Sequence, residues 1–201
     1  GEGYQGAAIG MLLFGVISIA LVKLGRIAHD KIVLNKLDKE QMIADKNVSV
    51  ALVDAASAIA SAIMLRSMLL WVEGTDVNAI VAITTGFIVV LLVLLLMTRL
   101  YELRFATNNH NDSFQKILCK GHIALAIEHS GNLIGTAIIV SAASVLLTYD
   151  PQTYVSNVTG WLIVGFALSM SLLMMVTVAK RLVLSGSCWQ KAWEQPPSSG
   201  V

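Results

Sequence analysis

Five long apolar stretches constrain the fold of this chain more than any other feature of its sequence. Each approaches the roughly 20 residues that a helix needs to cross the hydrocarbon core of a bilayer. Hydrophobic residues make up 56% of the 201-residue chain and charged residues only 13%, which is more apolar surface than a soluble domain of this length can bury. The sequence therefore predicts an all-α, polytopic transmembrane bundle with five spans. These are Ala7–Leu24, Val48–Val72, Val77–Thr98, Ile123–Thr148 and Val158–Val178.

The connections between these stretches alternate in charge. Residues 25–47 and 99–122 are rich in Lys and Arg, whereas residues 73–76 and 149–157 contain neither. The positive-inside rule places the basic links and the C-terminus in the cytoplasm and the N-terminus outside. No basic residue precedes the first stretch, so we expect a retained helix; a cleaved leader is the alternative.

The side chains of two regions predict whether they face lipid or the membrane surface. The third stretch contains the uniformly apolar run Phe87–Met97, which we expect to face lipid. Four aromatic residues fall near the predicted outer surface, where membrane proteins carry an aromatic belt. They are Trp71, Tyr149, Tyr154 and Trp161.

The second and fourth stretches resemble each other. A shift of 74 positions lays Asp54 on Glu128, Ser57 on Gly131 and Ser61 on Gly135. The first, third and fifth stretches each end in an arginine after a long apolar run. The sequence thus indicates a helix-pair repeat, in which a plain helix with a basic end precedes an acidic helix rich in small residues.

This repeat defines the expected domain organisation. Residues 1–178 form one transmembrane domain, with repeat units at about 7–72 and 77–148 and a partial third unit at 158–182. The incomplete third unit leaves open that the natural protein continues further. Residues 183–201 are expected to be a cytoplasmic, partly disordered tail.

The two intramembrane acids are the main candidates for function, since a carboxylate in hydrocarbon is costly unless it is paired, protonated or hydrated. Asp54, Ser57 and Ser61 share one helix face, and Glu128, Gly131 and Gly135 share its counterpart. Gly131 and Gly135 have the spacing that lets membrane helices pack closely. The two faces are expected to meet in a polar seam that binds a cation or carries protons. The alternative is that both acids lie near enough to the helix starts to be hydrated.

Polar neighbours extend this predicted ion or proton path. Asn132 and His129 lie in the fourth stretch, and His129 is either a relay partner of Glu128 or a packed histidine. His122 and His129 share a face, but membrane haem takes histidines from different helices and no second intramembrane histidine is expected, so no cofactor is predicted. The sequence leaves a metal unassigned. Signatures of phosphate loops, zinc sites and nucleophile elbows are absent from the sequence, which predicts no enzyme.

The small-residue stretches Lys46–Met64 and Lys120–Ile138 resemble those of the YjfL-like family of small bacterial inner-membrane proteins, classed as a domain of unknown function. The resemblance spans most of Ala7–Val178. Family members start these helices with an Asn-Thr-Ala-Ala-like motif, of which this chain keeps only Asn47. The resemblance implies a four-helix-like bundle in the bacterial inner (plasma) membrane, no known enzymatic activity and a link to envelope or stress operons.

Two functions fit these features. The first is an oligomeric ion or proton conduit lined by Asp54 and Glu128, with a homo-oligomer needed because one chain has too few polar helices to enclose a pore. The second is a non-enzymatic membrane scaffold or anchor in an envelope-stress assembly, whose cytoplasmic loops recruit a protein partner. Both take the lipid bilayer as their surroundings, and neither involves nucleic acid.

Overall fold

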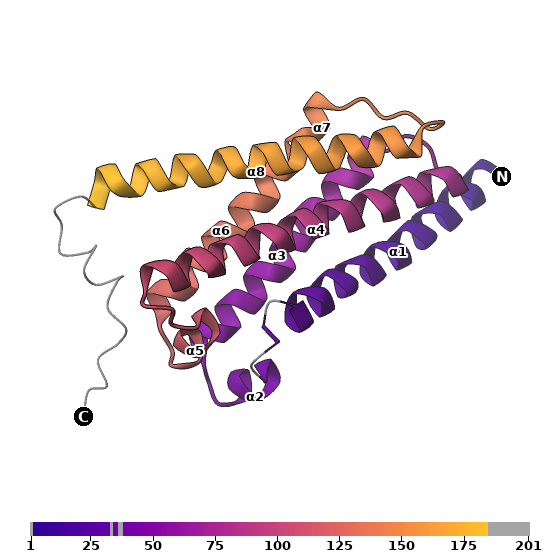
Figure 1. Ribbon diagram of the computed structural model, residues 1–201. Helices are drawn as coiled ribbons and strands as arrows, with labels where there is room; N and C mark the ends of the chain where they lie inside the picture. Colours follow the sequence, from indigo (N-terminus) through magenta and orange to yellow (C-terminus); the bar gives the residue numbers. More distant parts are fainter. Residues whose placement is uncertain (1, 33, 36–37, 185–201) are drawn as a thin grey trace.

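The structure is a computed structural model that describes residues 2–32, 34–35 and 38–184, and all its regular elements there are helices (Figure 1). Five helices of this described part are long and apolar enough to cross a membrane, the fourth running from Ile123 to Leu146. The prediction of an all-α bundle with five spans is confirmed; residues 185–201 of the predicted tail lie outside the described residues. The long helices are α1 (Glu2–Ile32), α3 (Val48–Trp71), α4 (Val77–Asn108), α6 (Ile123–Ser141) and α8 (Tyr154–Leu184), and the short ones α2 (Lys39–Ala44), α5 (Phe114–Cys119) and α7 (Ala143–Leu146).

The long helices form two layers (Figure 1). In one layer α1, α4 and α8 run side by side in the same direction, with α4 in the middle; α3 and α6 lie behind them and run the opposite way. The most extensive helix–helix contact is that between α3 and α6. We call the end that carries α2 and α5 the basic end, since both Lys- and Arg-rich connections lie there. The predicted neighbourhood of the second and fourth spans is therefore observed.

The starts of α3 and α6 are built alike at the basic end. Asn47 and His122 cap these helices by accepting hydrogen bonds from Val50 N and Leu125 N, both at 3.1 Å. Each cap follows a residue in the left-handed region, Lys46 with φ 61° and Gly121 with φ 78°. The two caps, like the two helix starts, are therefore 75 positions apart, one more than the 74-position shift that aligns the two sequences.

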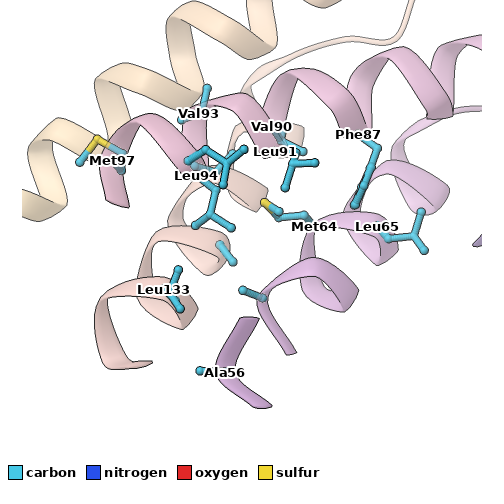
Figure 2. Packing of buried hydrophobic residues seen from close by; sticks show 14 of the residues in the cluster. Ala56, Met64, Leu65, Phe87, Val90, Leu91, Val93, Leu94, Met97 and Leu133 are labelled. Carbon is cyan, nitrogen blue, oxygen red and sulfur yellow. The ribbon is translucent and has the colours of Figure 1, made fainter. Parts of the chain in front are cut away.

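Most of α4 is buried between other helices, so the prediction that Phe87–Met97 faces lipid is wrong for all but one side of the run. Phe87, Val90 and Met97 are at most 1% exposed, and Figure 2 shows Phe87 beside Leu65 and Val90 beside Met64, two side chains of α3. The outer helices α1 and α8 bury far less of their surface. A helix that is apolar all round suits either lipid or a core, and here neighbouring helices cover all of the run except the side that carries Ile88, Leu92 and Leu96.

The end opposite the basic end is closed by aromatic packing. The Trp71 ring meets those of Tyr149 and Trp161 edge-on, each at a centroid distance of 5.2 Å. Trp71 Nε1 also donates to the Leu147 carbonyl at 2.7 Å. Trp161 is fully buried, so these residues form an aromatic cluster between helices rather than only a belt toward lipid.

Candidate functional site

The candidate site lies at the basic end, where α1 extends further than the sequence indicated. The apolar stretch ends at Leu24, but the helix continues to Ile32. The additional two turns bring Arg26, His29 and Asp30 against the acidic helices. Leu21, Gly25 and His29, spaced by four residues, form the buried side of this extension.

Asp54 belongs to a group of four charged side chains, which we call the Asp54 cluster: Arg26, Asp30, Lys39 and Asp54. Arg26 Nη2 lies 3.0 Å from Asp54 Oδ2, and Lys39 Nζ lies 2.7 Å from Asp54 Oδ1. Lys39 Nζ also donates to Asp30 Oδ2 at 2.6 Å. Both oxygens of Asp54 are therefore bound by cations, and two positive charges face two negative ones.

The electrostatics of Lys39 follow from this position. Burial acts to lower the pKa of Lys39, but the hydrogen bonds to Asp30 and Asp54 outweigh it, so the pKa is raised above its ordinary value. α2 places this lysine because Asp38 caps that helix, accepting from Gln41 N at 3.2 Å. Lys39 thereby links α1, α2 and α3.

Glu128 is paired separately, on the other side of the bundle. Its carboxylate meets Lys180 Nζ of α8. Nearby, Arg104 of α4 donates a hydrogen bond to Thr177 of α8. Asp54 is thus tied to the outer helix α1, and Glu128 to the outer helix α8.

The predicted seam between the two small-residue faces is not formed as expected. On α3, Ser57 and Ser61 are buried, at 3% and 1% exposure, but on α6 Glu128 is only partly buried and Gly131 is exposed. The buried face of α6 is instead made by Leu125, Ala126, His129, Ser130, Leu133, Thr136, Ala137 and Val140. The difference follows from the 75-residue spacing: counted from the caps, His129 and not Glu128 corresponds to Asp54.

The close helix contact also differs from the predicted one. A Cβ at Gly131 would meet nothing within 4 Å, and one at Gly135 would meet Leu172 of α8 at an ordinary 3.6 Å. A tight approach is instead at Gly25 of α1, where a Cβ would lie 2.6 Å from Ser61 Oγ and 3.4 Å from Phe87 Cζ; a second is at Gly86 of α4, where a Cβ would lie 2.6 Å from Met68 Sδ. Ser61 is therefore a packing residue against α1.

His129 is packed among rings. Its centroid lies 4.6 Å from that of Phe114 and 6.3 Å from that of His29 on α1. His29 and His129 are 1% and 3% exposed. The expectation that His129 has no histidine partner on another helix is therefore corrected, because buried His29 of α1 lies beside it. His29 was missed because it lies beyond the apolar stretch, and the buried spacing Leu21, Gly25, His29 was the available signal. Asn132 is partly buried on the adjoining surface of α6.

The polar chemistry of the site has two parts. The carboxylates are neutralised by cations, whereas both nitrogens of His29 and Nε2 of His129 are buried with no hydrogen-bond partner in the described part of the chain. Among the described residues no three His, Cys, Asp or Glu side chains are arranged to hold a metal ion. The ion pairs can hold helices together, and the two imidazoles have nitrogens that lack hydrogen-bond partners among the described residues.

Comparison with known proteins gives one match. Residues 3–69, about a third of the chain, match the family model described as Domain of Unknown Function (DUF350). This region covers α1, α2 and nearly all of α3, which is the first helix pair with the Asp54 cluster. No curated protein and no solved structure matches the chain. The first helix pair is thus similar to an uncharacterised family, and the apolar helices fit a multi-pass membrane protein.

Proposed function

We propose that the protein is a non-enzymatic scaffold of a bacterial inner membrane, with its N-terminus outside and its basic end in the cytoplasm. The observation that carries the proposal is the pairing of both intramembrane acids. Asp54 uses one oxygen for Arg26 and the other for Lys39, and Glu128 is paired with Lys180. These ion pairs fasten the outer helices α1 and α8 to the inner helices.

A cation path would need these carboxylates for the passing ion. Freeing Asp54 removes the carboxylate partner of Arg26 and one of the two partners of Lys39, which keeps Asp30. Breaking a fully buried ion pair costs about 3–5 kcal/mol, which is an upper bound here. The side chains of Asp54 and Lys39 are each only 15% exposed, so water compensates little of that cost. The pairing therefore favours a structural role for the acids.

The surfaces left for partners lie on the outer helices and at the basic end. α1 and α8 expose apolar side chains along most of their length, which suits the bilayer and further copies of the chain in a homo-oligomer. α2 buries no residue and presents the polar side chains Glu40 and Gln41 beside Ile43, which is 37% exposed. We assign the docking of a cytoplasmic protein, such as a member of an envelope-stress assembly, to α2.

An oligomeric proton or ion conduit is the second candidate, and one observation favours it. The His129 ring lies beside that of His29, and His29 in turn lies beside Asp30, which shares Lys39 with Asp54. Such a chain of titratable groups suits proton transfer at the basic end.

Flux and stability measured together separate the two functions. The wild type and the double variant Asp54→Asn/Glu128→Gln are reconstituted in liposomes. A second double variant, Glu40→Gln/Glu73→Gln, is the control, because both of its acids are exposed. A scaffold gives no proton or cation flux above empty liposomes, and the double variant melts at a lower temperature than the control. Wild-type flux that the double variant loses at unchanged melting temperature would establish the conduit instead.

A further inference from the structure

We propose that His29 and His129 bind one Cu⁺ ion between α1 and α6. Both imidazoles are more than nine-tenths buried, and three of their nitrogens have no hydrogen-bond partner among the described residues. An unsatisfied buried polar atom is destabilising, so three in one place call for a ligand. This inference does not depend on the proposed scaffold function.

The distance between the rings fits a shared metal ion. Their centroids lie 6.3 Å apart. With metal–nitrogen bonds of about 2.0 Å, two imidazoles on one ion have centroids about 6 Å apart when the nitrogen–metal–nitrogen angle is near linear, and about 5 Å apart when it is tetrahedral. The observed distance matches the near-linear case.

Asp30 supplies the support that a metal-binding histidine needs. Its Oδ1 is buried without a hydrogen-bond partner and lies 4.0 Å from His29 Nδ1, while its Oδ2 is held by Lys39. Histidine ligands commonly donate their second nitrogen to a carboxylate, which fixes the tautomer and the ring orientation. His29 Nε2 and His129 Nε2 are then the ligands, and a hydrogen bond from His29 Nδ1 to Asp30 Oδ1 would form if their 4.0 Å separation shortened on metal binding.

The number of ligands and the local charge select the metal. Imidazole binds Zn²⁺, Cu, Fe and Ni, but Zn²⁺ prefers four protein or water ligands, whereas Cu⁺ accepts two in a near-linear arrangement. The Asp54 cluster beside the histidines carries no net formal charge, two cations facing two carboxylates. A monovalent ion therefore costs less to bury there than a divalent one.

The test is a Cu⁺ titration of the whole chain in nanodiscs, under anaerobic conditions, against a chromophoric Cu⁺ chelator. We expect one Cu⁺ per chain, with equal binding by His110→Gln, whose histidine is exposed in the α4–α5 loop. His29→Gln and His129→Gln should each abolish the binding. Asp30→Asn should weaken it by about 10–100-fold, as other supporting carboxylates do.

X-ray absorption of the loaded protein keeps the test independent of variant folding. The wild type should show two nitrogen neighbours of copper in a near-linear site. Absence of Cu⁺ binding by the wild type, binding that survives both histidine substitutions, or Zn²⁺ binding that excludes Cu⁺ would each overturn the proposal. A hydrated histidine pair without a metal gives the first of these results.

Discussion

At the scale of single residues, the tight contact between α1 and α3 is set by Gly25. A Cβ there would lie 2.6 Å from Ser61 Oγ and 3.3 Å from Ser61 Cβ, so Ser61 and Phe87 would have to move. Gly25→Ala should therefore lower the free energy of unfolding by about 1–3 kcal/mol, as overpacking of a well-packed site does. Thermal unfolding in detergent measures the change.

Gly131→Ala is the matched control, because a Cβ at Gly131 would meet nothing within 4 Å. Alanine is favoured over glycine inside a helix by about 1 kcal/mol, so this variant should be as stable as the wild type or more stable. Equal losses at both positions would show that the α1–α3 contact is not close at Gly25.

Lys39 predicts a pH dependence. A lysine whose folded-state pKa is raised contributes its full stabilisation below its ordinary pKa of 10.5 and loses it as the pH rises through the folded-state value. The difference in melting temperature between the wild type and Lys39→Met should thus be constant from about pH 7 to pH 10 and shrink only above that range. Lys31→Met, at an exposed position of α1, should show little difference at any pH. A difference that disappears below pH 10 would contradict the pairing of Lys39.

At the scale of helices, sequence patterns predicted the existence and order of the five long helices but not their neighbours. Apolar length and charged connections are local properties, so they suffice to identify spans. Which span is central depends on contacts between helices, and α4, apolar on all sides, carries no signal that separates lipid from core.

The candidate site was predictable only in part for a related reason. Asp54 and Glu128 were found because charges inside apolar runs are conspicuous. Their partners Lys39 and Lys180 lie outside the apolar stretches or near their ends, and His29 lies past the predicted end of its span. The one-residue difference between the sequence shift and the helix caps then rotates Glu128 by about 100° around α6, away from the face that packs on α3.

The central position of α4 is testable with two neighbouring leucines. Leu94 is 2% exposed and Leu92 is 55% exposed. Leu94→Ala should destabilise the protein by about 2–5 kcal/mol through the cavity it leaves, whereas Leu92→Ala should cost much less. Unfolding of both variants in the same detergent gives the comparison. A larger loss of stability for Leu92→Ala would contradict the buried position of Leu94 and favour a lipid-facing α4.

At the scale of the whole molecule, the direction of the bundle in the membrane follows from its charges. We expect the basic end in the cytoplasm, because the links there carry the Lys and Arg residues. Single cysteines at Gly74 and His110, introduced after replacement of Cys119 and Cys188, report the two ends. An impermeant thiol reagent added to intact cells should label position 74 and not position 110; the opposite labelling pattern would reverse the orientation.

The central claim for the whole molecule is that the intramembrane acids hold the outer helices on the inner ones. Glu128 and Lys180 test it best, since α8 meets this acid through a single lysine. The measurement is the free energy of unfolding of four proteins: the wild type, Glu128→Lys, Lys180→Glu and the variant with both changes. A structural ion pair predicts that each single change destabilises and that the exchanged pair recovers stability, with a coupling energy of about 0.5–3 kcal/mol. Additive losses with no coupling would contradict the claim and leave Glu128 free for another role.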